Sequence, residues 1–275
     1  MMRLLADGVA LSGRIELDGR DLLTLSEGEM CAVRGDRLSM VFQEPMTALN
    51  PVRTIGAQVA EPLIVHGKAS REEARARAVE LLDRVGIPDA AVRANHYPHQ
   101  LSGGQRQRVV IAMALACGPA FIVADEPTTA LDTTVQRQIL RLLLELVDTT
   151  RAGLVVITHN LAVVSEIADR VLVMYAGEIV EAGSASNVLG DPSHPYTRGL
   201  LAALPTGPRE RRLNAIPGTV PALTARGPGC GFANRCGFVT ARCRERKPPL
   251  AGIGAGHEVR CFHTDRVRAS GGADV

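Results

Sequence analysis

The 275-residue sequence has little net charge, few lysines and no long apolar run. A formal net charge of +2 at pH 7 argues against nucleic-acid binding by charge alone. Lys68 and Lys247 are the two lysines among 31 basic residues, a bias that we attribute to genome base composition. No stretch approaches the run of about 18 apolar residues that a transmembrane helix needs. The N-terminus also lacks the pattern of a secretory signal, so we expect a cytoplasmic protein.

Cysteine is scarce before residue 230 and concentrated after it. Cys31 and Cys117 stand alone, and we expect them to be small core residues. The clustered cysteines are Cys230, Cys236, Cys243 and Cys261. In a reducing compartment such a cluster favours a metal site over disulfides. The spacing lacks the paired C-x-x-C of a zinc ribbon, and an iron–sulfur cluster, zinc and free thiols all remain open.

Short apolar runs alternate with helical patterns along most of the chain. Residues 121–124 and 154–157 are apolar runs separated by a helical stretch at 133–148, which is typical of buried parallel strands joined by a crossover helix. A further strand is expected at 38–42, and the pattern from about 54 to 118 is helical. The sequence therefore predicts an α/β fold.

The composition changes near residue 190, where prolines become frequent and periodicity is lost. Just before this point, residues 171–180 predict two strands joined by a turn at Ala176-Gly177. We therefore expect one domain over residues 1–190 and a C-terminal region with the four cysteines over 191–275.

Two carboxylates follow the apolar run at 121–124. Asp125 suits the binding of Mg²⁺ through water, and Glu126 suits the orientation or deprotonation of an attacking water. Open α/β sheets bind their ligands at this end of their strands. Strands also end in Asp for no catalytic reason, so the pair alone leaves both interpretations open.

Three other patterns also allow both a functional and a purely structural interpretation. Ser102-Gly103-Gly104 precedes an apolar helical run, which indicates either an anion site at a helix N-terminus or an ordinary Ser N-cap. His159, after the run at 154–157, suits contact with a terminal phosphate or a local hydrogen bond. Gln43, after the run at 38–42, suits contact with a metal or water, or is polar surface.

Five short motifs follow one another along the chain: Val41-Phe42-Gln43, Leu101-Ser102-Gly103-Gly104-Gln105, Asp125-Glu126, Pro127-Thr128-Thr129-Ala130-Leu131-Asp132 and Thr158-His159. In kind and order they resemble the ATP-binding cassette (ABC) ATPases, over about residues 10–190. The resemblance implies a P-loop NTPase nucleotide-binding domain, here incomplete at its N-terminus, with a helical subdomain at about 54–118 and a small Cys-rich C-terminal extension. It implies ATP and Mg²⁺ as cofactors.

The resemblance also implies a role for each matching residue. Glu126 matches the catalytic glutamate, His159 the switch histidine, and Asp125 the Walker B aspartate that holds Mg²⁺. Gln43 matches the Q-loop glutamine, which contacts the metal and links it to the membrane partner.

Two further matches are to residues that bind nucleotide in the family. Ser102-Gly103-Gly104-Gln105 matches the signature loop, and Asp132 matches the D-loop aspartate.

Three longer stretches narrow the resemblance to one group within the ABC ATPases. Residues 42–51 (FQEPMTALNP), 194–201 (HPYTRGLL) and 216–221 (IPGTVP) resemble the ATPases of dipeptide, oligopeptide and nickel importers. The resemblance implies integral membrane permease subunits, a second ABC ATPase in a head-to-tail dimer and, indirectly, an extracytoplasmic peptide-binding protein as partners. It implies no nucleic acid, and a place at the cytoplasmic face of the cell membrane. ATPases with this cysteine tail are associated with a [4Fe–4S] cluster.

A non-transport ABC protein, such as a DNA-repair or translation factor, is the alternative from another class. Such proteins typically carry long coiled coils or tandem cassettes, which this sequence lacks. The choice between peptide and nickel as substrate stays open.

A nucleotide-binding cassette also needs a phosphate loop, G-x-x-x-x-G-K-[ST], which the sequence does not contain. The aromatic residue that stacks on adenine upstream of that loop is missing too. Residues 2–5 predict the end of a helix, which matches the helix that follows the loop in the family. The sequence is then either a fragment of a longer protein or a non-catalytic remnant that supplies only its signature loop to a partner ATPase. Either way, we expect the isolated chain not to bind or hydrolyse ATP.

Overall fold

The computed structural model describes residues 1–5, 8–129, 131–204, 215–222, 224, 227–254 and 256–270. These residues form two compact units, Met1–His159 and Asn160–Val275. Across the described ranges, no helix combines the length and apolar character that crossing a membrane requires.

The first unit contains a three-stranded parallel sheet. Its strands are β3 (Leu38–Val41), β4 (Phe121–Asp125) and β5 (Gly153–Ile157), in the order β3-β4-β5. Helix α7 (Thr133–Thr150) connects β4 to β5. Ile122 and Ala124 of the central strand are fully buried, which explains why this strand is a continuous apolar run. The predicted parallel strands and their crossover helix are confirmed.

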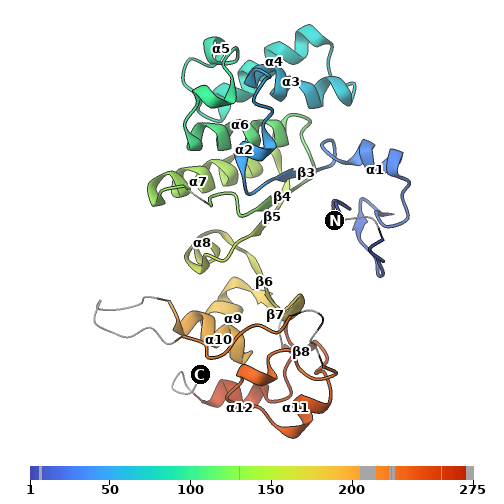
Figure 1. Ribbon diagram of the computed structural model, residues 1–275, viewed down its shortest axis with the longest axis vertical. Coiled ribbons are helices and arrows are strands. Elements are labelled where there is room, and N and C mark those ends of the chain that lie inside the picture. The colour runs from blue at the N-terminus through green and yellow to red at the C-terminus, as the bar shows by residue number, and fades with distance from the viewer. Residues whose placement is uncertain are drawn as a thin grey trace. The chain divides into compact units, whose positions relative to one another are not determined.

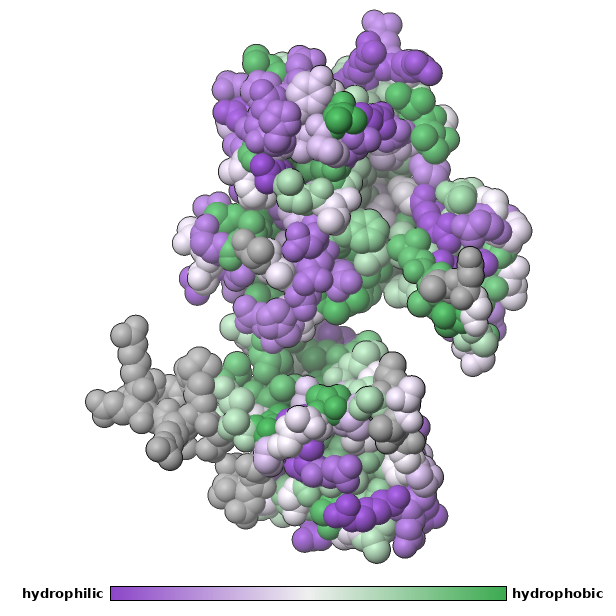
Figure 2. Space-filling model, in the orientation of Figure 1, coloured by the Kyte–Doolittle hydropathy of each residue, from purple (hydrophilic) through white to green (hydrophobic). Residues whose placement is uncertain are grey.

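A helical layer connects β3 to β4. Its segments are α2 (Pro45–Ala48), α3 (Ile55–Val65), α4 (Arg71–Arg84), α5 (Ala90–Arg93), a 3₁₀ turn (Pro98–Gln100) and α6 (Gly103–Leu115). Ala74, Ala78 and Leu82 form the buried stripe of α4, at the spacing expected of an amphipathic helix. Figure 1 shows α3, α4 and α5 grouped beyond α6, and polar residues cover much of their outer surface in Figure 2.

One hydrophobic core joins this helical layer to the sheet. It includes Ile55 of α3, Leu82 of α4, Val109 of α6, Ile122 of β4 and Ile139 of α7, none of them more than 1% exposed. The predicted helical segment at 54–118 therefore shares its core with the sheet.

The N-terminal part of this unit is less regular. It contains a two-stranded antiparallel ladder, β1 (Glu16–Leu17) with β2 (Arg20–Asp21), and helix α1 (Glu27–Val33), which begins with a Ser26 capping box. Residues 1–5 are not helical, so the helix end predicted there is wrong. Four residues do not close the hydrogen-bonded turns that a helix needs to be stable.

The second unit contains a four-stranded antiparallel sheet in the order β6-β7-β9-β8. Its strands are β6 (Arg170–Tyr175), β7 (Glu178–Ser184), β8 (Ala251–Gly254) and β9 (His257–Val259). Ala176 and Gly177 both have positive φ, and they form the predicted turn between β6 and β7. Because β7 pairs with β9, the strands around residues 171–184 belong with the C-terminal residues, whereas the composition predicts a boundary at 190.

Short helices complete the second unit: α8 (Leu161–Ile167), α9 (Ala185–Gly190), α10 (Pro195–Ala202), a 3₁₀ turn (Ala233–Arg235), α11 (Ala241–Glu245) and α12 (Thr264–Ala269). Pro195 opens α10, as predicted for residues 194–201. Phe232 is buried against Tyr175 and Tyr196, with ring centroids 5.1 and 5.5 Å away.

A fully buried carboxylate joins β7, β9 and the start of α10. Glu181 Oε1 accepts hydrogen bonds from the backbone N–H of Ser193 (2.7 Å) and from His257 Nε2 (2.8 Å). Its Oε2 accepts one from the backbone N–H of His194 (3.0 Å). Three donors from distant segments therefore compensate the burial of this carboxylate.

We expect Glu181→Ala to destabilise the second unit by about 3–5 kcal/mol, because it leaves His257 and two backbone N–H groups buried without their acceptor. Urea denaturation followed by circular dichroism measures the change. The matched control is Arg170→Ala, which removes an exposed ion pair with Glu258 and should cost less than about 1 kcal/mol. Equal effects of the two substitutions would contradict the role of the buried carboxylate.

Candidate functional site

The carboxyl ends of β3, β4 and β5 lie at one edge of the sheet because the three strands are parallel. Gln43 follows β3, Asp125 ends β4 and is followed by Glu126, and His159 follows β5. Asp125 is in register with Ile157, two residues before His159. Residues that are far apart in the sequence therefore meet here.

Glu126 is at the centre of this group. Its Oε2 accepts hydrogen bonds from Gln43 Nε2 (3.2 Å) and Thr129 Oγ1 (2.7 Å). Its Oε1 is 2.9 Å from His159 Nδ1. The Glu126 side chain is 25% exposed and that of His159 is 78% exposed, so the carboxylate is partly shielded while the imidazole faces solvent.

The backbone holds Glu126 in an uncommon conformation. Its φ is +43°, in the left-handed region that non-glycine residues seldom adopt. Its N–H donates to the carbonyl of Ile157 (2.8 Å), and its own carbonyl accepts from the N–H of Thr129 (3.1 Å). These two bonds tie the end of β4 to β5 and close a tight turn, which maintains a conformation that costs energy by itself.

Hydrogen bonds set the charge of this carboxylate. The bonds from Thr129 and then His159 hold the pKa of Glu126 below its ordinary value, because both stabilise the ionised form. Glu126 is therefore ionised at neutral pH and loses its charge, and these bonds, as the pH falls through the lowered pKa. Since an ionised carboxylate only accepts, the Nδ1 that faces it carries a proton.

Thr129 is the member of this group that the sequence did not single out. It lies within the Pro127–Asp132 motif, three residues after Glu126. A Thr hydroxyl can bond back to a residue near it in a turn, and the position of Thr129 three residues after Glu126 was the available indication.

The predicted signature loop, Ser102–Gln105, forms a capping box at the start of α6. Ser102 Oγ accepts from the backbone N–H of Gln105 (3.3 Å), and Gln105 Oε1 accepts from the N–H of Ser102 (3.1 Å). The ordinary N-cap interpretation of Ser102 is therefore physically correct, and it is compatible with an anion site at the same helix end.

Asp132 forms the N-cap of α7. Its Oδ1 accepts from the backbone N–H groups of Thr134 (3.1 Å) and Val135 (3.0 Å). A Cβ placed on Gly104 would lie 2.8 Å from Val135 Cγ1, so the signature loop packs tightly against the start of α7. The structure thus groups the signature loop with Asp132, and groups Gln43 and His159 with Glu126.

In the part of the chain that the structure describes, no group of three or more His, Cys, Asp or Glu residues is arranged to hold a metal ion. Magnesium at phosphate sites commonly uses one or two carboxylates together with substrate oxygens and water. Asp125, at the end of β4, is compatible with that mode of binding.

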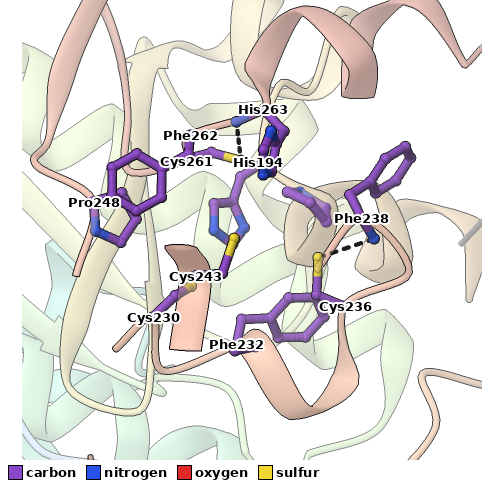
Figure 3. Close-up of a pocket in the computed structure, with 12 residues that line it drawn as sticks. His194, Cys230, Phe232, Cys236, Phe238, Cys243, Pro248, Cys261, Phe262 and His263 are labelled. Carbon is purple, nitrogen blue, oxygen red and sulfur yellow. Dashed lines mark hydrogen bonds between the residues drawn. The ribbon is translucent and has the colours of Figure 1, made fainter. Parts of the chain in front are cut away.

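The four clustered cysteines line one cavity in the second unit, together with His194 and His263. In Figure 3 the four sulfurs are spread around this cavity rather than gathered at one point. Backbone N–H groups donate to two of them, from Phe238 to Cys236 Sγ and from His263 to Cys261 Sγ, both at 3.3 Å.

Burial keeps these groups uncharged. It raises the pKa of both Cys236 and Cys261 to about 11, and the neighbouring cysteines add to the shift. Burial also lowers the pKa of His194 to about 3, and its Nδ1 accepts a hydrogen bond from the backbone N–H of Tyr196 (3.1 Å). Cys236, Cys261 and His194 therefore line the cavity as neutral groups.

Two families match the chain. The family described as "ABC transporter" matches residues 1–129, and the "Oligopeptide/dipeptide transporter, C-terminal region" matches residues 180–243. A solved dimer of the ATP-binding cassette MJ0796, bound to ADP and Pi after hydrolysis, is 36% identical, with a TM-score of 0.56 over 63% of this chain and 74% of that chain. The fold is that of an ABC ATPase nucleotide-binding domain.

Similar proteins are peptide-transport ATPases. A peptide import ATP-binding protein of Brucella abortus is 52% identical over 98% of this chain and 84% of its own length. The oligopeptide transport ATP-binding protein AppD of Bacillus subtilis is 48% identical (93% and 78%), and the dipeptide transport ATP-binding protein DppD of Escherichia coli 47% (93% and 79%). The chain therefore belongs to the ABC transporter ATP-binding proteins of the peptide importer family. These comparisons do not support the predicted [4Fe–4S] cluster.

The close approach of Gly104 to α7 generates a test. Gly104→Ala should destabilise the first unit by about 1–3 kcal/mol, because the added methyl group overlaps the branched side chain of Val135. Gly103→Ala is the matched control, since its added methyl group would meet Leu131 at an ordinary 3.5 Å. Chemical denaturation of both variants measures the difference, and equal stabilities would contradict the packing described.

Proposed function

We propose that this chain is the ATP-binding subunit that energises an ABC importer of dipeptides or oligopeptides at the cytoplasmic face of a cell membrane. The observation that carries the proposal is the ionised Glu126 carboxylate, held by Gln43 and His159 at the carboxyl edge of the sheet. The peptide-import names of the relatives favour peptides over nickel. Residues 1–190 would supply the ATPase function, and residues 191–275 the region particular to peptide importers.

Each site residue has a role in this proposal. Glu126 orients or deprotonates the water that attacks the terminal phosphate. His159 donates from Nδ1 to Glu126 and, when both ring nitrogens carry a proton, from Nε2 to the phosphate. Asp125 and Gln43 contact Mg²⁺, whose chemistry is to neutralise charge on the phosphate oxygens. Gln43, which is exposed after β3, also links the site to the permease, as the resemblance to the Q-loop glutamine implies.

The signature loop serves a second ATPase subunit in this proposal. In a head-to-tail dimer, the start of α6 at Ser102–Gln105 faces the nucleotide held by the partner, and Asp132 lies beside it at the start of α7. The isolated 275-residue sequence, which contains no phosphate loop, does not bind ATP on its own.

The test uses this chain preceded by a phosphate-loop segment, assembled with permease subunits and a second ATPase in lipid vesicles. Uptake of a labelled oligopeptide should depend on ATP, and Glu126→Gln should reduce ATP turnover by at least about 100-fold, because the amide neither accepts a proton nor orients water as a carboxylate does. Peptide-independent turnover that is unaffected by this substitution would overturn the proposal.

The isolated chain is the control in the same experiment. Isothermal titration should detect no ATP binding to it, and a micromolar dissociation constant would contradict the role assigned to the missing phosphate loop.

We further propose that Cys230, Cys236, Cys243 and Cys261 hold an iron–sulfur cluster. Two observations favour it: the four thiols line one cavity, and backbone N–H groups donate to two of the sulfurs, as they do around such clusters. A cluster spans more space than one metal ion, and the sulfurs in Figure 3 are not gathered at one point. A bound cluster would ionise these thiols and cross-link the segments that carry them.

Anaerobic purification of the full chain tests this second proposal. We expect visible absorbance near 400 nm, about four iron and four sulfide per chain, and their loss in a Cys236→Ser variant. Cys31→Ser is the matched control, because Cys31 is exposed on α1 and outside the cavity. A folded chain that is colourless and free of iron would overturn the proposal.

A further inference from the structure

The catalytic carboxylate proposed above has a hydrogen-bond partner that none of the matched motif roles includes. We propose that Thr129 is the positioning residue for Glu126, holding Oε2 so that Oε1 is the oxygen that meets the attacking water. The inference rests on the proposed catalytic role of Glu126. It adds that the two carboxylate oxygens have different roles: Oε2 is held in place, and Oε1 meets the water.

The geometry of the turn brings Thr129 to this place. Its backbone N–H donates to the carbonyl of Glu126 at 3.1 Å, and its hydroxyl donates to Glu126 Oε2 at 2.7 Å. One residue thus holds both the main chain and the side chain of Glu126. The hydroxyl bond is the shortest of the three described on this carboxylate, as expected of O–H bonded to an ionised oxygen.

The rest of the turn holds Thr129 in place. Thr128, directly before it, is 9% exposed, and its carbonyl accepts a hydrogen bond from Gln136 Nε2 of α7 (3.0 Å). At its other end the turn begins from a Glu126 whose N–H is bonded to β5. The position of the Thr129 hydroxyl is therefore set by the strand before it and the helix after it.

The two oxygens of Glu126 differ in their free capacity to accept hydrogen bonds. Each carboxylate oxygen has about two acceptor sites. Oε2 accepts from both Gln43 and Thr129, so its sites are filled. Oε1 is bonded to His159 alone among the described partners, so one site remains for a proton of water. With Oε2 held, the carboxylate does not rotate to exchange the two oxygens, which is preorganisation of the base.

A turn-forming Thr without this role is the alternative explanation, and the two differ in measurable properties. A purely structural Thr129 would change stability when substituted, with no specific effect on kcat. A positioning Thr129 sets the orientation of the carboxylate, so its loss lowers kcat and leaves KM unchanged.

The experiment compares Thr129→Val, which keeps the shape and removes the hydroxyl, with Thr129→Ser, which keeps the hydroxyl. At pH 7, carbon-13 NMR of the Glu126 carboxyl in the full chain should show a changed chemical shift in the Val variant and the original shift in the Ser variant, because the hydroxyl bonds directly to that group. In the assembled importer, the Val variant should lose about 10-fold in kcat with KM unchanged. The Ser variant should restore kcat.

Each other outcome has a defined meaning. An unchanged Glu126 carboxyl chemical shift in the Val variant overturns the inference, whatever the protein's function. If Glu126→Gln abolishes turnover while the Val and Ser variants turn over equally, the inference is also overturned and the proposed function stands. If Glu126→Gln leaves turnover unchanged, the proposed function fails, and the catalytic role of Thr129 fails with it. Should the Val variant not fold, Thr129→Ala gives the same comparison with Ser.

Discussion

The parallel alignment of β3, β4 and β5 is the constraint on which the first unit depends. Parallel pairing requires long crossovers, which here are the helical layer between β3 and β4 and helix α7 between β4 and β5. The same pairing brings three carboxyl ends to one edge, where Gln43 and His159 both form hydrogen bonds with Glu126. The core that holds the strands in register therefore also sets the geometry around the carboxylate.

The second unit depends on a different arrangement. Its antiparallel sheet is completed by strands from near the end of the chain, and a buried carboxylate on β7 binds donors from β9 and from the start of α10. This places the cysteines Cys243 and Cys261 beside His194, from a segment far earlier in the sequence. The region matched to peptide transporters is thus folded by polar contacts between segments as well as by its aromatic core.

The sequence allowed the site to be located but not described in detail. Apolar runs ending in polar residues predicted the strands, and parallel pairing made Gln43, Glu126 and His159 neighbours. The Thr129 contact could not be predicted because it depends on the left-handed backbone conformation of Glu126. No residue type near that position requires such a conformation. The Glu181–His257 pair joins positions 76 apart, and only the β7–β9 pairing reveals it. Proline content predicted a boundary at 190, whereas strand pairing decides which residues fold together.

The capping box at the start of α6 has a consequence for how that helix end meets an anion. A serine hydroxyl has one proton to donate and two lone pairs to accept with. In Ser102 a lone pair is taken by the N–H of Gln105, and this leaves the hydroxyl proton free to point outward. The cap therefore survives contact with an incoming oxyanion, because the two interactions use opposite polarities of one group. A helix end of this kind can bind an anion while its N-cap hydrogen bond stays intact.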